Sequence, residues 1–382
     1  MAKENEVKKL FTVILTNYNN QNYIEESLSS IFSQDYPNIE LIITDDCSSD
    51  FDSSKIEKFI SNYKRKNITN IQFVFNKTNL GTVKTLNKAL TKAHGDYILF
   101  FASDDKLPSN DVLTKYVSRF ERTKYNVITS RWILCDSALK PMRNYVNPIK
   151  GWLYNRKLSR QYYNMCIANQ YGAGSTCYRK CIFEKYAPID EKYKLLEDWP
   201  FWLKLISNGE TIFFDNFDGL FHRCGGVSNS TVDLDSKKFF YYDILNLYRD
   251  DIMPALNRFS IYKRLKILRS YDQFISEYSR YVDVDKYRRD FNKYVSIDWK
   301  MKNLWRFYKY SPHVLEKIII MIKHNIVIPI TVILSLLVDF IVVNGYKLSN
   351  NMILIMSMVS YLIIYCLVSV FHGLFNALKR GR

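Results

Sequence analysis

Asp104 and Asp105 are adjacent carboxylates that follow the apolar, β-forming run Tyr97–Phe101 after Ala102 and Ser103. A buried strand that ends in acids places oxygen ligands in the crevice at the carboxyl ends of an open α/β sheet. Hard oxygen ligands of this kind suit Mg²⁺ or Mn²⁺ carrying phosphate. The alternative interpretation is an Asp-rich turn that caps the helix after Pro108.

A second pair of acids, Asp45 and Asp46, follows the apolar run Ile39–Thr44 and opens a polar loop that reaches Asp50. Both acidic loops are expected at the same edge of the sheet, where their carboxylates can accept hydrogen bonds from a base or ribose. The sequence contains neither a Walker-type Gly-rich loop nor a G-x-G-x-x-G motif. Phosphate is therefore expected to be held by cations.

A third pair, Glu197 and Asp198, precedes an aromatic, apolar segment with helical spacing that begins at Trp199. Acids at a helix start are commonly caps that favour the helix dipole. The same pair can also supply a general base that removes a proton from an attacking hydroxyl. The residues alone leave both interpretations open.

Alternating strands and helices must position these acids. Strands and helices at this spacing indicate right-handed crossovers and a mostly parallel sheet with flanking helices, which is an α/β fold. Residues 129–170 are irregular and rich in aromatic side chains. The expected strands are Phe11–Thr16, Ile39–Thr44, Ile71–Phe75 and Tyr97–Phe101, and the expected helices include one from about Ser53 to Tyr63.

The charge distribution favours a membrane surface as partner. The formal net charge is +16, and basic residues are frequent between Lys237 and Lys323, interleaved with aromatic ones. This stretch runs into two long apolar segments and carries no nucleic-acid-binding signature, so an anionic membrane is favoured over nucleic acid. The seven cysteines form no Cys-x-x-Cys pair, as expected for reduced cytosolic thiols.

Two apolar segments near the C-terminus, Ile326–Asn344 and Met352–Phe371, are each about long enough to span a bilayer, and the polar turn Gly345–Asn351 separates them. Buried core helices are the alternative. Basic residues flank the outer ends, and the N-terminus lacks an apolar signal core, so we expect a two-span hairpin in the inner (cytoplasmic) membrane with the catalytic domain cytoplasmic. Asp339 inside the first span is expected to face the second helix, a lipid head group or a neighbouring subunit, which leaves a homo-oligomer open.

Three blocks within the first 105 residues carry a family resemblance. They run from VILTNYNN to the acids at 45–50, then NLGTVKTLNKAL, then GDYILFFASDD. Together the blocks resemble the N-terminal half of family 2 glycosyltransferases, which have the nucleotide-diphospho-sugar (GT-A) fold. The segment Phe221–Ser228 is similar to the family's Tyr-Arg-x-Gly-Gly-Val-Ser segment, and Glu197-Asp198 is similar to its acceptor-site motif.

The resemblance implies a role for individual residues. Asp198 would be the catalytic base, and Glu197 and Trp199 would lie at the acceptor. Arg223, in a flexible loop that closes over the donor, would counter the diphosphate charge. Ala102 replaces the usual first acid of the D-x-D motif, so Asp104, with Asp105 beside it and His222 completing the shell, would bind the metal. The nucleotide pocket would be lined by Thr16, Tyr18, Asn19, Asp45, Asp46, Asn79, Gly81, Lys84 and Asp104.

The resemblance therefore implies an inverting, metal-dependent glycosyltransferase of the hexosyltransferase class. It would move a sugar from a nucleotide-sugar, as a UDP-sugar, to a hydroxyl of a lipid-linked saccharide during synthesis of a capsule or similar surface polysaccharide. The Gln-x-x-Arg-Trp motif of processive synthases is absent. A polyprenyl-phosphate glycosyltransferase and a non-catalytic nucleotide-binding scaffold remain as alternatives. The expected domains are 1–230 (catalytic), 231–320 (basic amphipathic helices) and 321–382 (membrane hairpin and tail).

Overall fold

The computed structural model describes residues 8–49, 51–144, 157–224, 234–296 and 305. The chain divides into two compact units, Met1–Tyr294 and Val295–Arg382, and almost all described residues belong to the first. The two apolar segments expected to form a membrane hairpin lie outside the described residues. Within the described part, no helix is both long and apolar enough to cross a membrane.

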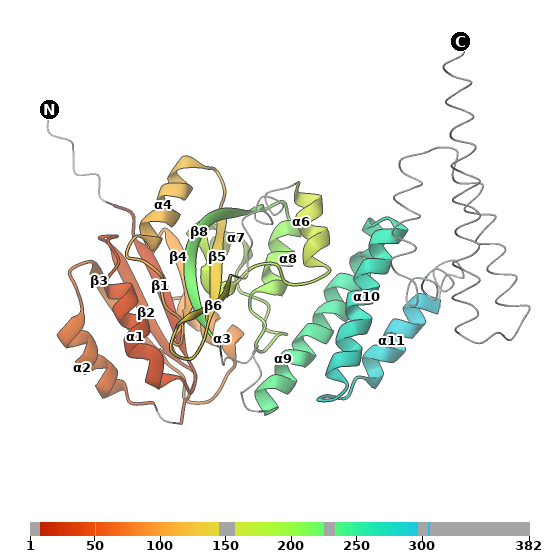
Figure 1. Ribbon diagram of the computed structural model, residues 1–382, viewed down its shortest axis with the longest axis horizontal. Coiled ribbons are helices and arrows are strands. Elements are labelled where there is room, and N and C mark those ends of the chain that lie inside the picture. The colour runs from red at the N-terminus through yellow and green to blue at the C-terminus, as the bar shows by residue number, and fades with distance from the viewer. Residues whose placement is uncertain (1–7, 50, 145–156, 225–233, 297–304, 306–382) are drawn as a thin grey trace, which may run out of the picture. The chain divides into compact units, whose positions relative to one another are not determined.

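A mixed sheet forms the centre of the first unit (Figure 1). Its order is β3-β2-β1-β4-β7-β5-β6, and β8 pairs with β5. The first four strands in this order are parallel, but β7 is antiparallel to both of its neighbours, so the expected mostly parallel arrangement holds for one half of the sheet. The strands are β1 (Phe11–Asn17), β2 (Ile39–Asp45), β3 (Ile68–Phe75), β4 (Tyr97–Ala102), β5 (Val127–Cys135), β6 (Pro141–Asn144), β7 (Thr176–Arg179) and β8 (Ile212–Arg223).

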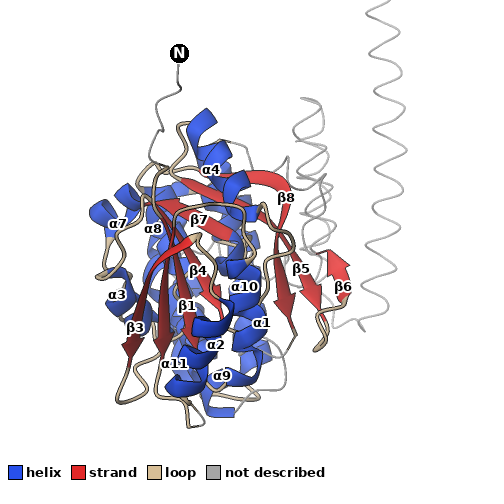
Figure 2. Cartoon of the chain, turned by 90° about the vertical axis from the view of Figure 1, so that its left-hand side faces the viewer, coloured by secondary structure: helices blue, strands red, loops and turns tan. Residues whose placement is uncertain are grey.

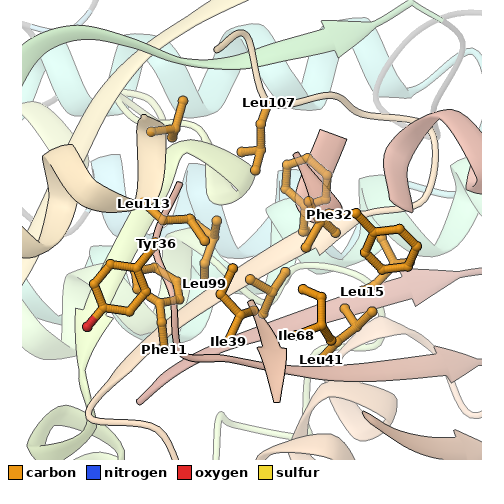
Figure 3. Packing of buried hydrophobic residues seen from close by; sticks show 14 of the residues in the cluster. Phe11, Leu15, Phe32, Tyr36, Ile39, Leu41, Ile68, Leu99, Leu107 and Leu113 are labelled. Carbon is orange, nitrogen blue, oxygen red and sulfur yellow. The ribbon is translucent and has the colours of Figure 1, made fainter. Parts of the chain in front are cut away.

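Helices cover both faces of the sheet, because the central strands are apolar on both sides. Alternate residues of β1, such as Phe11 and Leu15, share one buried cluster with Leu41, Leu99 and Phe32 of α1 (Figure 3). On the opposite face Phe100 packs against Phe183. One face carries α1 (Gln21–Phe32), α2 (Ser53–Tyr63) and α4 (Val112–Arg122), and the other carries α3 (Thr82–Leu90), α7 (Lys180–Tyr186) and α8 (Trp199–Ser207) (Figure 2).

The four strands expected from the sequence are confirmed, although β3 begins earlier than predicted, at Ile68. The prediction of an irregular segment from 129 to 170 is wrong, because this range contains most of β5, all of β6 and α6 (Leu158–Met165). Polar residues in the middle of β5 hide it from a hydrophobic pattern. Ser130 is buried, and its hydroxyl hydrogen-bonds to the hydroxyl of Tyr116 at 2.7 Å.

Three further helices follow the sheet: α9 (Leu234–Leu247), α10 (Ile261–Tyr278) and α11 (Asp285–Ser296). A π-helical turn at Tyr248–Ile252 and a 3₁₀ segment at Met253–Arg258 join α9 to α10. The ring of Tyr248 stacks on Tyr271 of α10 with centroids 4.9 Å apart and meets Trp199 of α8 edge-on at 5.9 Å. This aromatic packing attaches the helical segment to the start of α8.

Candidate active site

A cavity of about 1180 Å³ opens at the carboxyl ends of the parallel strands. Four of the sequence segments singled out above meet there: the ends of β1, β2 and β4, and the start of α8. The side chains around it include acids from all three predicted pairs. Predicted site residues that line the cavity are Thr16, Tyr18, Asp46, Asn79, Gly81, Asp104, Asp105, Glu197, Asp198, Trp199 and His222.

Asp46 shapes one end of the cavity. Its Oδ1 accepts hydrogen bonds from Leu80 N at 2.8 Å and from Asn76 Nδ2 at 2.9 Å, and its Oδ2 accepts from Gly81 N at 2.8 Å. Gly81 has a φ of +88°, and a Cβ there would lie 2.6 Å from the carbonyl oxygen of Lys194. The end of β2 is thereby fastened to the loop before α3, which is the wall expected to hold a nucleoside.

Three predicted nucleotide-pocket residues do not line this cavity: Asp45, Asn19 and Lys84. The carboxylate of Asp45 is buried and accepts from Asn17 Nδ2 at 2.8 Å and from Ser48 N at 2.9 Å. Asn19 has a φ of +52°, and its backbone N–H donates to Ser48 Oγ. Asp45 and Asn19 therefore shape the loops, whereas Lys84 is exposed on α3.

Asp104, Asp105 and His222 form a charged group at the end of β4. Oδ1 of Asp105 lies 2.9 Å from Nδ1 of His222. Burial alone opposes protonation of His222, but the charge and hydrogen bond of Asp105, with Asp104 nearby, raise its pKa to about 9. Burial, together with the charge of Asp105, raises the pKa of Asp104. Because Nδ1 of His222 faces Asp105, the carboxylate orients the ring, and Nε2 is the nitrogen left to bind a metal when the ring is neutral.

The donor set at this position suits a divalent cation. Both carboxylates are almost fully buried yet line the cavity, and Asp104 accepts no side-chain hydrogen bond from the described residues. A Cβ at Gly174 would lie 3.3 Å from Oδ2 of Asp105, which is a tight contact, so the glycine gives this carboxylate room. Among the described residues, no three or more His, Cys, Asp and Glu side chains are grouped to hold a metal ion. A cation here would need further ligands from a bound phosphate.

Arg223 does not lie in a flexible loop as predicted, because it is the last residue of β8 and is 3% exposed. Its Nε donates to the carbonyl oxygen of Asp104 at 3.0 Å, its Nη1 to Ser137 O, and its Nη2 to Glu26 at 2.8 Å. The guanidinium also lies 4.2 Å from the ring centroid of Tyr23. These partners occupy the side chain, which therefore holds the Asp104 loop in place; residues 225–228 of the predicted loop lie outside the described residues.

Asp198 is both the N-cap of α8 and part of the cavity wall. Its Oδ1 accepts from the backbone N–H of Trp199, and its Oδ2 accepts from Asn169 Nδ2 at 2.9 Å. Burial raises the pKa of Asp198, and burial plus the charge of Asp198 raises the pKa of Glu197. Capping and base roles are compatible, since a carboxylate has several lone pairs.

Trp199 itself is 2% exposed, and its indole N–H donates to Met165 O at 2.7 Å. It therefore contributes mainly packing beneath the cavity, although it was expected at the acceptor.

Three residues of this region were missed from the sequence: Asn169, Lys194 and Asp243. Lys194 lines the cavity, and its Nζ lies 3.7 Å from the ring centroid of Phe239. Asp243 accepts three backbone hydrogen bonds from residues 194–196. Asp243 had a usable signal, because an acid within the apolar run FFYYDILNL is expected to be buried and paired. Asn169 had none.

The chain is similar to known glycosyltransferases. Residues 12–186 match the family model "Glycosyl transferase family 2". The putative teichuronic acid biosynthesis glycosyltransferase TuaG of Bacillus subtilis is 37% identical over 151 residues, which are 40% of this chain and 58% of the relative. The putative colanic acid biosynthesis glycosyl transferase WcaA of Escherichia coli is 23% identical over 263 residues, which are 68% of this chain and 88% of the relative.

Among solved structures, S. aureus TarS in complex with UDP-GlcNAc aligns with a TM-score of 0.46 and 18% identity, over 75% of this chain and 91% of that one. The family match covers the strands and loops that carry Asp46, Asp104 and Asp105, and the cavity joins them to Asp198. Residues 12–186 are thus similar to family 2 glycosyl transferases, and the chain is a glycosyltransferase.

Proposed function

We propose that this glycosyltransferase moves a sugar from a UDP-sugar, with inversion, to a hydroxyl of a lipid-linked saccharide during synthesis of a cell-surface polysaccharide. The observation that carries the proposal is the shared cavity: Asp104 and Asp105 line it from the end of β4, and Asp198 lines it from the start of α8. Groups for the leaving diphosphate and for the attacking hydroxyl thereby face one space.

Asp198 is the proposed general base. As the acceptor oxygen attacks the anomeric carbon, Oδ2 of Asp198 takes the hydroxyl proton while the bond from that carbon to the diphosphate oxygen breaks. The hydrogen bond from Asn169 and the N-terminus of α8 both favour the ionised carboxylate of Asp198, which partial burial disfavours. No second acid is required, because the diphosphate leaves as an anion.

Asp104, with Asp105 beside it, would hold a Mg²⁺ or Mn²⁺ ion together with phosphate oxygens of the donor. When bound, such an ion neutralises charge that develops on the leaving diphosphate. Lys194, which also lines the cavity, adds positive charge to this space. The nucleoside would occupy the wall that Asp46 fastens, next to Thr16, Tyr18 and Asn79.

The acceptor class rests on relatives and on composition. TuaG and WcaA are named for teichuronic acid and colanic acid biosynthesis, both of them surface polysaccharides. The apolar segments 326–344 and 352–371, with basic flanks, support anchoring in the inner membrane with the catalytic domain in the cytoplasm. A lipid-borne acceptor would then share the membrane with the enzyme, which raises its effective concentration.

A polyprenyl-phosphate glycosyltransferase is the second candidate, favoured by the same apolar segments. The acceptor of such an enzyme is already an anion and needs no base. This second function therefore predicts that loss of the Asp198 carboxylate leaves turnover largely intact. The similarity to glycosyltransferases disagrees with the alternative of a non-catalytic nucleotide-binding scaffold.

The proposal is tested by incubating membranes that contain the full chain with radiolabelled UDP-glucose, UDP-galactose or UDP-N-acetylglucosamine, with and without EDTA. We expect one label to enter the organic-solvent extract, and EDTA to suppress its entry. Membranes lacking the protein serve as the control. Failure of every UDP-sugar, with transfer from GDP- or TDP-sugars instead, would contradict the proposed donor.

A further inference from the structure

Asp243 of α9 binds the loop that leads into Glu197 and Asp198. Its Oδ2 accepts three consecutive backbone N–H groups, from Lys194 at 2.9 Å, Leu195 at 2.7 Å and Leu196 at 3.1 Å. Hydrogen bonds from backbone amides to a carboxylate are short and about twice as strong as neutral ones. One carboxylate oxygen thus fixes three successive peptide units just before the proposed base.

A carboxylate is costly to bury unless it accepts hydrogen bonds. The three amides therefore indicate that the role of Asp243 is to bind this loop. Asp243 is 4% exposed, and Ile244, Leu245 and Leu247 beside it on α9 are buried apolar residues. Burial raises the pKa of Asp243, and the three amides oppose that effect. An apolar side chain at this position would leave three backbone donors without their acceptor.

The loop held by Asp243 touches both ends of the cavity. The carbonyl oxygen of Lys194 accepts from Val83 N at 3.2 Å and lies against Gly81, at the end expected to hold the nucleoside. Two residues after Leu196 the chain reaches Asp198, which lines the same cavity. A shift of this loop would change the distance from the base to a donor seated by Gly81.

We propose that Asp243 is a positioning residue: from α9 it holds the 194–196 loop so that the carboxylate of Asp198 lies within hydrogen-bonding distance of the acceptor hydroxyl that attacks the donor sugar. This inference rests on the proposed function, because it takes Asp198 as the base. It also gives α9 a role in the chemistry, although α9 lies beyond the matched family segment 12–186. A misplacement of about 1 Å costs on the order of 100-fold in rate.

A purely structural role makes a different prediction. If Asp243 only stabilises the fold, Asp243→Ala lowers the melting temperature but leaves kcat unchanged in protein that is still folded. If it positions Asp198, kcat at saturating donor falls about 10- to 100-fold, while the affinity for UDP changes far less. Asp243→Asn keeps one acceptor oxygen and should recover much of kcat.

The experiment measures kcat for transfer from the active UDP-sugar into membrane lipid extract, UDP affinity by calorimetry, and thermal unfolding, for the full chain. Asn246→Ala is the matched control, since it removes the 2.8 Å hydrogen bond from Tyr287 to α9 without touching the loop. A lowered kcat with retained UDP affinity in Asp243→Ala, partly rescued in Asp243→Asn, supports the inference. An unchanged kcat, or equal losses of kcat and UDP affinity, would overturn it.

Two outcomes are kept apart by Asp198→Asn. If this variant transfers sugar as well as the parent, the proposed function has failed and Asp243 has no base to position. If Asp198→Asn is inactive but Asp243→Ala turns over normally, only the positioning role is wrong. Where Asp243→Ala does not fold, Asp243→Glu decides, since it keeps the carboxylate but moves it by one methylene: a kcat reduced at least about threefold with parental UDP affinity supports the inference, and a parental kcat overturns it.

Discussion

Nδ2 of Asn169 donates a 2.9 Å hydrogen bond to Oδ2 of Asp198, so the loop before β7 contacts the proposed base directly. The other oxygen of Asp198 accepts the Trp199 N–H at the start of α8. Both bonds favour the ionised carboxylate, whereas burial favours the protonated form. The balance decides the pH at which Asp198 can accept a proton.

Asn169→Ala should move the acid limb of the pH–rate profile upward. Loss of a hydrogen bond to a carboxylate raises the pKa of Asp198, and a base works only when it is deprotonated. Activity in the variant is therefore lost at higher pH as the medium is acidified, by roughly one pH unit. The measurement is kcat from pH 5 to pH 9. Gln170→Ala, which loses a bond to Ala168 O in the same loop, should leave the limb in place.

Asp104→Asn should abolish the effect of metal on UDP binding. In the parent, EDTA is expected to weaken UDP binding about tenfold or more, because the proposed cation joins Asp104 to the diphosphate. In the variant, calorimetry should give similar affinities with and without Mn²⁺. The variant should fold at least as well as the parent, since it removes one of two adjacent buried acids. If metal strengthens UDP binding equally in both proteins, Asp104 is not a metal ligand.

Arg223→Lys should reduce the free energy of unfolding by about 2 kcal/mol, since one ammonium cannot replace three donations in different directions. Urea unfolding of the ligand-free protein measures it. Lys106→Ala, which breaks an exposed 3.2 Å ion pair to the same Glu26, should cost less than about 1 kcal/mol. Unchanged stability with weakened UDP binding would instead indicate that Arg223 counters the diphosphate charge.

Glu40→Gln should destabilise the sheet in a pH-dependent way. Burial opposes ionisation of Glu40, but bonds from the His94 N–H and ring and from Thr12 and Asn70 lower its pKa overall. A lowered folded-state pKa contributes stability above the unfolded value, near 4.3, and this stability is lost as the pH falls through the folded-state pKa.

We therefore expect a loss of about 2 kcal/mol at pH 7 in Glu40→Gln, shrinking steadily below about pH 4. Urea unfolding of both proteins at pH 7 and below about pH 4 tests this expectation. Glu25→Gln, at a half-exposed 3.5 Å ion pair with Lys55, is the control and should change stability little. A difference between parent and Glu40→Gln that stays constant with pH would contradict the charge-based explanation.

The parallel half of the sheet was predictable because its strands are continuous apolar runs that end in polar loops. Periodicity placed β1, β2 and β4 to within a residue at each end. It failed for β5, whose polar residues are satisfied inside the protein by partners such as Tyr116 and Ser175. Those partners come from distant parts of the chain, so no local pattern could reveal them.

The acids of the site were predictable for a related reason, since two pairs follow a strand with a clear end and the third precedes a helix with a clear start. Their contacts were not. Whether a polar residue faces a cavity or another loop depends on backbone turns such as those at Gly81 and Asn19, and this difference separates Asp46 from Asp45. Arg223 was misplaced because β8 extends farther than its apolar pattern.

Turnover by Asp198→Asn with the active UDP-sugar and membrane acceptor tests most directly whether Asp198 is the general base. The amide preserves shape and can still cap α8, but it cannot accept the hydroxyl proton. We expect kcat to fall by about 10²- to 10⁴-fold while UDP affinity and melting temperature stay close to those of the parent. Turnover within a few-fold of the parent would contradict the central claim that Asp198 is the base.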